Sequence, residues 1–180
     1  VCAKSGYSTR VLEVNQQFLD KGLNSLKSSL EKAASKGKVT AQEKDATLAR
    51  LTGTIKAEDF KDCDMVIEAV IENMDEKKRI FSTMDKICPP HAILASNTSC
   101  LSVLQMAMAT KRPDKCIGMH FFQPVPVMRM VEIVKTIAVS KETVETAEKV
   151  GKSLGKQVVF AKDTPGFLVN RMGFPFMMNA

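Results

Sequence analysis

The apolar run Met65-Val-Ile-Glu-Ala-Val70 is the strongest fold signal in this chain. Its β-branched and apolar residues predict a strand that is buried on both faces, as in a parallel sheet covered by helices. Residues 92–95 and 115–121 read as the next strands, and apolar residues at helical spacing lie between them. Strands and helices therefore alternate. This alternation predicts an α/β doubly wound sheet, because right-handed crossovers leave few other topologies.

The segment before this run predicts a strand followed by an inserted helical hairpin. Residues 9–14 read as a short strand, and the spacing of the apolar residues that follow predicts a long helix ending near Gly37. A second helix is expected from about residue 41 until shortly before Gly53. Thr40 and Glu43 have the spacing of a capping box, which supports this start.

The second half of the chain continues the alternation. Helices are expected around Ile80 and over residues 103–109, and a later helix over residues 141–154. Strands at 130–134 and 157–160 flank that later helix. With no internal repeat or low-complexity linker, one domain is the simplest interpretation.

Composition limits the classes of function. Of the 180 residues, 44% are apolar, which is enough for a core of ordinary size. The excess of 26 basic over 20 acidic residues gives a net charge of +6, mainly from Lys on polar helix faces. One Tyr and no Trp provide few groups for stacking on bases, so we expect no nucleic-acid partner. No tract approaches the roughly 20 apolar residues that span a bilayer, so no membrane partner is expected. An acidic small molecule matches the charge better.

Five cysteines indicate a reducing intracellular compartment, such as cytoplasm, mitochondrial matrix or peroxisome. Their number is odd, and they form neither a C-x-x-C pair nor a metal-ligand spacing, so no metal site is expected. Cys100 follows Ser99 and could act as a nucleophile. A small buried filler is the favoured interpretation, because no His lies near it in sequence.

Three polar motifs carry the candidate chemistry: Ala95-Ser-Asn-Thr-Ser-Cys-Leu101, the segment from His120 to Glu132, and Asp163-Thr-Pro-Gly-Phe-Leu-Val-Asn-Arg171. His120 closes an apolar strand, and Glu132 lies on the next strand after a Pro-Val-Pro corner. A carboxylate bonded to one ring nitrogen sets the tautomer and favours the imidazolium, as a general base for an alcohol requires. The alternative is a satisfied core histidine. His91, beside two prolines in an expected surface turn, is interpreted as structural.

These motifs resemble the L-3-hydroxyacyl-CoA dehydrogenase family, in its short-chain form that includes the 3-hydroxybutyryl-CoA dehydrogenases. The resemblance covers nearly the whole chain. It implies a Rossmann-like domain, NAD as cofactor and an acyl-CoA substrate whose 3-hydroxyl is reversibly oxidised, in fatty-acid or butyrate-type metabolism. It implies His120 as base and Glu132 as its charge partner, with Ser99 and Asn170 holding the substrate oxygen. For Asn170 the alternative is capping of a helix that starts near Pro165-Gly166.

The resemblance also implies the binding residues. Glu13, at the end of the second strand of the family's fold, is expected to hold the ribose hydroxyls and to favour NAD over NADP; its alternative is a solvated strand-end acid. The path of the cofactor is expected to be lined by Ala69, Glu72, Lys77, Asn97 and Ser99. Lys77 has the alternative of a solvated helix face, since it lies in the charged run of residues 75–79. Ser29 and Lys36, on the helical hairpin, are expected to contact CoA, and a solvated Lys is the alternative for Lys36.

The resemblance sets expectations for the ends of the chain. Residues 1–165 are expected to form the NAD-binding domain without the family's first strand and Gly-rich turn, and residues 166–180 to begin a C-terminal helical domain. We expect the 180-residue chain alone to be inactive, and the parent protein to dimerise through that domain. Gln123 stands where the family commonly has Asn, which leaves its role open. Two alternatives to a single-function enzyme are the dehydrogenase section of a multifunctional β-oxidation protein and a non-catalytic fragment or structural relative.

Overall fold

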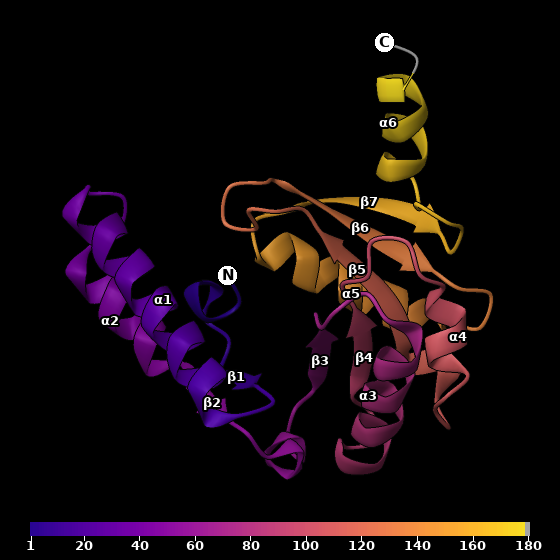
Figure 1. Ribbon diagram of the computed structural model, residues 1–180, viewed down its shortest axis with the longest axis horizontal. Helices are drawn as coiled ribbons and strands as arrows, with labels where there is room; N and C mark the ends of the chain where they lie inside the picture. The colour runs from indigo at the N-terminus through magenta and orange to yellow at the C-terminus, as the bar shows by residue number, and fades with distance from the viewer. Residues whose placement is uncertain (179–180) are drawn as a thin grey trace. The chain divides into compact units, whose positions relative to one another are not determined.

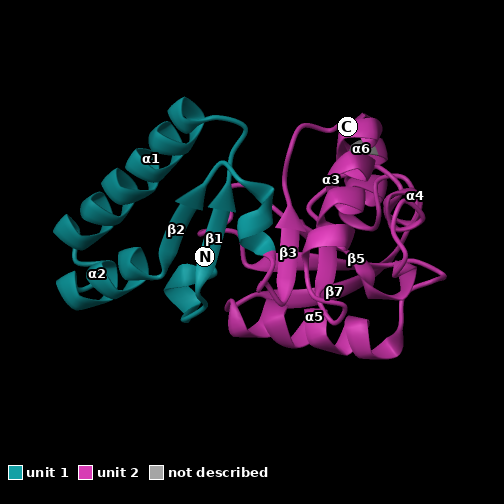
Figure 2. Cartoon of the chain, turned by 90° about the horizontal axis from the view of Figure 1, so that it is seen from below, with its two compact units in different colours: residues 1–60 teal, residues 61–180 magenta. Residues whose placement is uncertain are grey.

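The computed structural model describes residues 1–178. The chain divides into two compact units, Val1–Phe60 and Lys61–Ala180, coloured separately in Figure 2.

The first unit contains two parallel strands and the helical hairpin (Figure 1). Its elements are η1 (Ala3–Ser5), β1 (Thr9–Leu12), α1 (Gln16–Ser35), α2 (Ala41–Ala49), β2 (Leu51–Thr54) and η2 (Ala57–Phe60). The predicted capping box of α2 is confirmed: Thr40 Oγ1 accepts from the Glu43 amide, and Glu43 accepts from the Thr40 amide at 2.7 Å. Strand β2 was not expected, because Leu-Thr-Gly-Thr is short and contains only one large apolar residue.

The second unit is a five-stranded sheet with helices (Figure 1). Its elements are β3 (Met65–Glu68), α3 (Met74–Ile87), β4 (Ile93–Ser96), α4 (Val103–Ala107), η3 (Pro113–Lys115), β5 (Cys116–Phe121), β6 (Met130–Lys135), α5 (Lys141–Ser153), β7 (Gln157–Lys162) and α6 (Val169–Met178). The strand order is β3-β4-β5-β6-β7, parallel except for the antiparallel pair of β5 and β6. The predicted α/β class is confirmed, with a mixed sheet.

The expectation that the Met65–Val70 run is buried on both faces is wrong. Val66 and Glu68 are buried, whereas Met65 and Ile67 are only half-buried, and the strand ends at Glu68. The reason is the position of β3 at the edge of the five-stranded sheet. Helix α3 packs on the face that carries Glu68, since Lys77 of that helix bonds to it. Strands β4 and β5, further inside the sheet, are buried along their whole length.

Helices α4 and α5 cover opposite faces of the sheet. Figure 2 shows α5 along one side of the second unit. A Cβ on Gly118 of β5 would meet Val103 of α4, whereas a Cβ on Gly151 of α5 would meet Val131 of β6. Side chains alternate between faces along a strand. His120 is two residues from Gly118, and Glu132 is one residue from Val131. Both therefore lie on the face of α4.

We predict that Gly118→Ala destabilises the protein by about 1–3 kcal/mol, as overpacking of a filled core does. The added Cβ would lie 2.6 Å from Val134 Cβ and 3.1 Å from Val103 Cγ2, and a Cβ cannot rotate away. Urea unfolding measures the effect. The matched control is Gly22→Ala inside α1, where nothing lies within 4 Å; it should stabilise by roughly 0.5–1 kcal/mol. Equal unfolding midpoints for Gly118→Ala and wild type would contradict the close approach of α4 and the sheet.

Candidate active site

His120 and Glu132 form the central pair of the site. They lie directly opposite each other on the antiparallel strands β5 and β6. His120 Nδ1 is 2.6 Å from Glu132 Oε2, and both side chains are buried. The chain between the strands folds back as the Pro-Val-Pro corner suggested. The predicted pairing of imidazole and carboxylate is confirmed.

Glu132 is held in its ionised form. Desolvation of the buried side chain opposes ionisation, but hydrogen bonds from His120 and from the amides of Val169 and Leu168 outweigh it, so the pKa of Glu132 is lowered. An ionised carboxylate only accepts hydrogen bonds. The hydrogen in the pair therefore belongs to His120 Nδ1, so the neutral form of this imidazole has its lone pair on Nε2.

The second oxygen of Glu132 anchors the start of α6. Glu132 Oε1 accepts from the amides of Leu168 at 3.0 Å and Val169 at 2.9 Å. Amides at the start of a helix have no partner inside the helix, and a carboxylate there also interacts favourably with the helix dipole. One carboxylate thus joins the imidazole to the helix that carries Asn170.

Two aromatic rings flank the imidazole. The ring centroids of His120 and Phe122 are 4.5 Å apart, and those of His120 and Phe167 are 5.8 Å apart in an edge-on arrangement. Phe167 is buried and packs with Val103 and Val134. The rings restrict the orientation of the imidazole and exclude water from part of its surface.

Ser99 belongs to the loop of residues 97–102 between β4 and α4, here called the Ser99 loop. Its backbone amide donates to Glu72 Oε1 at 2.8 Å, and its backbone carbonyl accepts from Asn170 Nδ2 at 3.3 Å. The residue itself is exposed. Ser99 and Asn170, predicted from separate motifs, are therefore brought together. The capping alternative for Asn170 is not observed, because Glu132 caps α6 while the Asn170 amide reaches Ser99.

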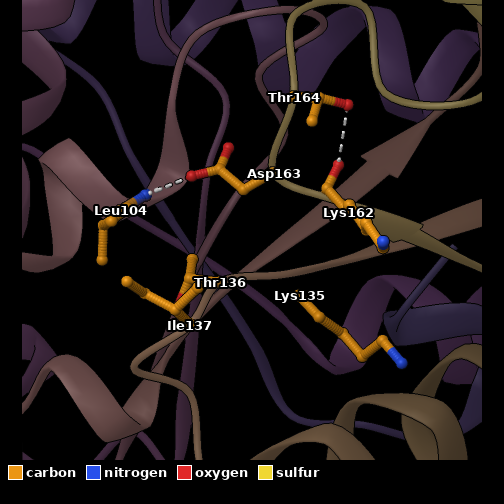
Figure 3. A pocket seen from close by; sticks show the side chains of 7 residues that line it. All are labelled: Leu104, Lys135, Thr136, Ile137, Lys162, Asp163 and Thr164. Atoms are coloured by element: carbon orange, nitrogen blue, oxygen red, sulfur yellow. Dashed lines mark hydrogen bonds between the residues drawn. The ribbon is translucent and has the colours of Figure 1, made fainter.

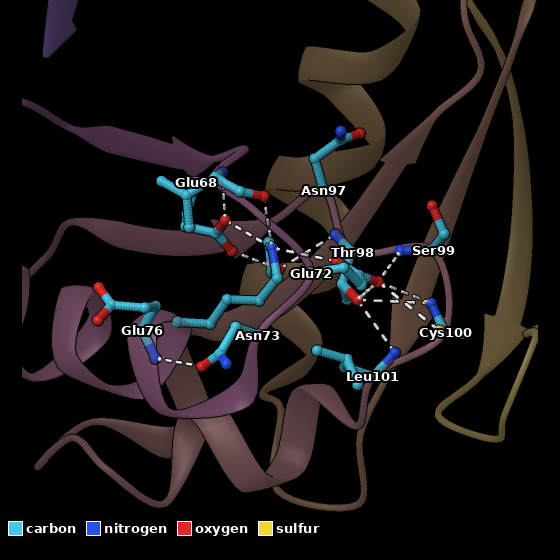
Figure 4. Close-up of polar contacts among 12 residues, drawn as sticks. Glu68, Glu72, Asn73, Glu76, Asn97, Thr98, Ser99, Cys100 and Leu101 are labelled. Carbon is cyan, nitrogen blue, oxygen red and sulfur yellow. Dashed lines mark hydrogen bonds and ion pairs between the residues drawn. The ribbon is translucent and has the colours of Figure 1, made fainter. Parts of the chain in front are cut away.

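Lys77 is 1% exposed, so the alternative of a solvated helix residue is wrong. Its Nζ lies 2.7 Å from Glu68 Oε1 and 3.3 Å from Glu72 Oε2. Glu72 also accepts from the Thr98 hydroxyl and the Ser99 and Cys100 amides (Figure 4). Partial burial opposes the ionisation of Glu72, but these hydrogen bonds and the charge of Lys77 outweigh it and lower the pKa of Glu72. Both residues thus support the Ser99 loop.

Sequence reasoning missed Glu68 and Ser96 in this network. Glu68 Oε2 accepts from Ser96 Oγ at 2.7 Å, and Ser96 Oγ accepts from the Thr98 amide at 3.1 Å. A signal was available, since a Glu inside the apolar run of residues 65–70 must find a buried cation or donors to avoid a large desolvation cost. The cation, Lys77, is nine residues away on the next helix and could not be identified from that pattern.

Asn97 and Ala69 lie at the ends of neighbouring parallel strands. Asn97 Oδ1 accepts from the Phe121 amide at 2.8 Å, which ties the end of β4 to the residue after His120. Its amide nitrogen is left as a donor. Ala69 follows β3 and is exposed. The carboxyl ends of β3 and β4 therefore present small and neutral polar groups, in keeping with the crevice that dinucleotides occupy in such folds.

The other predicted binding residues lie in the first unit. Glu13 directly follows β1 and is half-buried, and its carboxylate accepts from the Val14 amide at 3.3 Å. Ser29 is exposed on α1, and Lys36 is exposed at the C-cap of that helix. Gln123 is exposed directly before the β5–β6 turn of the second unit. The binding roles of these residues stay predictions.

The interpretation of Cys100 as a buried filler is wrong, because the residue is exposed. Its thiol lies 3.7 Å from Glu72 Oε1. Desolvation and the neighbouring Glu72 charge raise the pKa of Cys100, which disfavours the thiolate that a nucleophile needs. His91, by contrast, is exposed as expected and lies 2.9 Å from Asp64 Oδ1.

A pocket of about 440 Å³ lies at the carboxyl ends of β6 and β7 (Figure 3). Because β6 runs antiparallel to β5, this end of the sheet is opposite to the end that carries His120. The pocket is therefore separate from the His120–Glu132 pair. Its lining residues are Leu104, Lys135, Thr136, Ile137, Lys162, Asp163 and Thr164.

Over residues 1–178, no three His, Cys, Asp or Glu side chains gather in a way that could hold a metal ion. In the same part of the chain, no helix is long and apolar enough to cross a membrane.

Residues 1–164 match the family model described as "3-hydroxyacyl-CoA dehydrogenase, NAD binding domain". The chain is 42% identical over 178 residues to a probable 3-hydroxybutyryl-CoA dehydrogenase of Bacillus subtilis, covering 99% of this chain and 62% of that protein. It is also 42% identical over 176 residues to a glyoxysomal fatty acid beta-oxidation multifunctional protein of Brassica napus, covering 98% of this chain and 24% of that protein.

The crystal structure of (S)-3-hydroxybutyryl-CoA dehydrogenase PaaH1 from Ralstonia eutropha superposes with a TM-score of 0.95 at 39% identity. The match covers 98% of this chain and 62% of that chain. The chain thus spans a little under two thirds of the length of these two 3-hydroxybutyryl-CoA dehydrogenases.

We predict that protonation of Glu132 lowers the free energy of unfolding at acid pH. The pKa of Glu132 in the folded protein is lowered from the ordinary value of 4.5. Its contribution to the free energy of unfolding is therefore complete above pH 4.5 and is lost as the pH falls through the lower folded-state pKa. Urea midpoints measured between pH 3 and 7, roughly the range that titrates carboxylates, should fall less steeply on the acid side for Glu132→Gln than for wild type. Glu142→Gln, at an 80% exposed side chain, is the control and should keep the wild-type slope. Identical acid slopes for Glu132→Gln and wild type would contradict an ionised Glu132.

Proposed function

The chain belongs to the 3-hydroxyacyl-CoA dehydrogenase family, and we propose that its protein catalyses the reversible NAD-dependent oxidation of an L-3-hydroxyacyl-CoA to the 3-oxoacyl-CoA. The observation that carries this proposal is the buried His120–Glu132 pair, linked through α6 to the contact between Asn170 and Ser99. A base with a charge partner, together with a hydroxyl and an amide, is the set of groups that oxidation of a secondary alcohol requires.

His120 is assigned as the general base. Its Nε2 takes the proton of the substrate 3-hydroxyl, because Nδ1 already donates to Glu132. The imidazolium that forms lies 2.6 Å from an ionised carboxylate, which stabilises the new positive charge. In the reverse direction the same imidazolium returns the proton to the oxygen of the 3-oxoacyl group.

Ser99 and Asn170 are assigned to hold the substrate oxygen. The exposed Ser99 offers a hydroxyl, and its backbone is fixed by Glu72 on one side and by Asn170 on the other. Holding the oxygen within reach of a base converts binding energy into correct orientation of the reacting groups.

The residues at the ends of β3 and β4 fit the uncharged portions of NAD. Asn97 and Ser99 are neutral donors there, and Lys77 is already paired with Glu68 and Glu72. NAD, when bound, supplies the acceptor for the hydride from C3. Glu13 is assigned to the ribose hydroxyls, where a carboxylate accepts their hydrogen bonds and would repel a 2′-phosphate.

Two further assignments concern the CoA part of the substrate and the cellular compartment. Ser29 and Lys36 are proposed to contact the CoA nucleotide, since an ammonium group on a long side chain can reach a phosphate. A reducing intracellular compartment is the proposed location, because the five cysteines are odd in number and no disulfide joins any of them within residues 1–178.

The 42% identity with a multifunctional β-oxidation protein favours a second context for the same chemistry. In that case the chain would be the dehydrogenase section of a larger protein with further activities. The gene sequence on both sides of these 180 residues distinguishes the two contexts. A non-catalytic relative is disfavoured, because such a protein has no need to retain a buried base and its charge partner.

In the full-length protein, His120→Gln should lower kcat by at least about a hundredfold, the low end for loss of a general base, and keep NAD affinity. Stopped-flow measurement of NADH with acetoacetyl-CoA and with 3-hydroxybutyryl-CoA tests both directions. His91→Gln is the matched control, because His91 is exposed and its side chain contacts Asp64. Turnover of His120→Gln near that of wild type would overturn the assignment of the base.

Glu13→Ala in the full-length protein should weaken NAD binding and narrow the preference for NAD over NADP. The reason is the loss of the acceptor for the ribose hydroxyls together with the charge that repels a 2′-phosphate. The ratio of kcat/KM for the two cofactors measures the preference, and Glu58→Ala, an exposed acid of the same unit, is the control. An unchanged ratio would make Glu13 an ordinary surface acid.

A further inference from the structure

Asp163 is a charged residue of the third motif that has no part in the proposed proton transfer. It directly follows β7, and its carboxylate accepts three hydrogen bonds from the start of α4. Ser102 Oγ donates to Oδ2 at 3.0 Å, the Val103 amide donates to Oδ1 at 2.9 Å, and the Leu104 amide donates to Oδ2 at 2.8 Å. Asp163 therefore joins the end of β7 to the end of the Ser99 loop.

The 163–170 segment, which leads from Asp163 to Asn170, contacts the Ser99 loop at both of its ends. Asp163 holds the end of the loop at Ser102, and Asn170 Nδ2 donates to the Ser99 carbonyl. Between these points, Glu132 accepts from the amides of Leu168 and Val169. The segment is thus fixed by two carboxylates, one of which also holds the base.

Phe167 shows that this segment is held in a demanding conformation. Its φ of +50° lies in the left-handed region that a bulky side chain rarely adopts. Such a conformation persists only where the surroundings over-determine it. Here the side chain is 3% exposed and packs with Val103. The backbone amide of Val103 donates to Asp163. The conformation places the Phe167 ring against His120.

The bonds of Asp163 leave it poorly suited to bind a substrate or move a proton. Both of its oxygens are already occupied by donors of the protein, and none of these donors belongs to the residues assigned to chemistry. Its position at the pocket of Figure 3 is likewise on the opposite end of the sheet from His120. Its effect on the reaction must pass through the loop and the segment that it joins.

We propose that Asp163 is a positioning residue, which fixes the Ser99 loop against the 163–170 segment so that Ser99 and Asn170 hold the substrate oxygen beside His120. This inference rests on the proposed function. The positioning role requires a carboxylate at residue 163 rather than an amide of the same size. Asn has one accepting oxygen for the three donors and turns an N–H toward at least one of them.

The test is a double-mutant cycle in the full-length protein with Asp163→Asn and Asn170→Ala. Asp163→Asn alone should lower kcat/KM for acetoacetyl-CoA by about 10- to 100-fold, as expected for hydrogen bonds to a charged group. The Kd of NAD should change less than about twofold, since the cofactor groups at β3 and β4 are not touched. On the Asn170→Ala background, Asp163→Asn should cost less than about threefold, because residues that act through one another are non-additive.

The matched control is Asp64→Asn, the same chemical change at a side chain that is 89% exposed and contacts His91. It should leave kcat/KM and the NAD Kd at their wild-type values. If Asp163→Asn gives no folded protein, Ser102→Ala takes its place, because it removes one of the three donors. A smaller loss is then expected, roughly 3- to 10-fold for one hydrogen bond, with the same non-additivity.

Three results would overturn the inference. The first is a wild-type kcat/KM for Asp163→Asn, and the second is a loss of kcat/KM that is as large on the Asn170→Ala background as in the single variant. The third is a loss of NAD affinity as large as the loss of kcat/KM. The proposed function fails separately. If His120→Gln keeps turnover, the chemistry is wrong whatever Asp163 does. If His120→Gln is inactive and Asp163→Asn behaves as wild type, only the positioning role is wrong.

Discussion

The ionised carboxylate of Glu132 is the interaction on which the candidate site is built. One oxygen accepts from His120 Nδ1, and the other accepts from the first amides of α6. A buried charge is costly unless it is fully paired, so removal of either set of donors would leave the carboxylate unsatisfied. The orientation of the imidazole and the anchorage of the helix that carries Asn170 are therefore coupled through a single side chain.

A second group of charges supports the other side of the site. Lys77 lies between Glu68 and Glu72, and Glu72 holds the Ser99 amide. Asp163 performs a related function at the end of the same loop. The Ser99 loop is thus held by the carboxylate of Glu72 from the β3–α3 connection and by that of Asp163 after β7. Asn170, on the helix that Glu132 anchors, holds it on a third side. Several charged groups therefore fix the geometry of this one loop.

Much of the fold could be predicted from the sequence, because the signals are local. The apolar strands, the period of the helices and the capping box of Thr40 and Glu43 each depend on residues within one element. The expectations failed where coverage by other elements decides burial. Met65 and Ile67 look like core residues but lie half-buried on an edge strand. For Lys77 the charged run left a solvated helix face open as an alternative, whereas the residue is buried.

The residue types of the chemistry were readable in the sequence, because a base, a carboxylate, a hydroxyl and an amide stand in three distinct motifs. The pairing of His120 with Glu132 followed from adjacent strands joined by a proline-containing corner. The roles of Glu68, Glu132 at α6 and Asp163 could not be derived in that way. Their partners lie between 9 and 61 residues away in the sequence, and a hydrogen bond over such a separation exists only once the sheet has brought the two segments together.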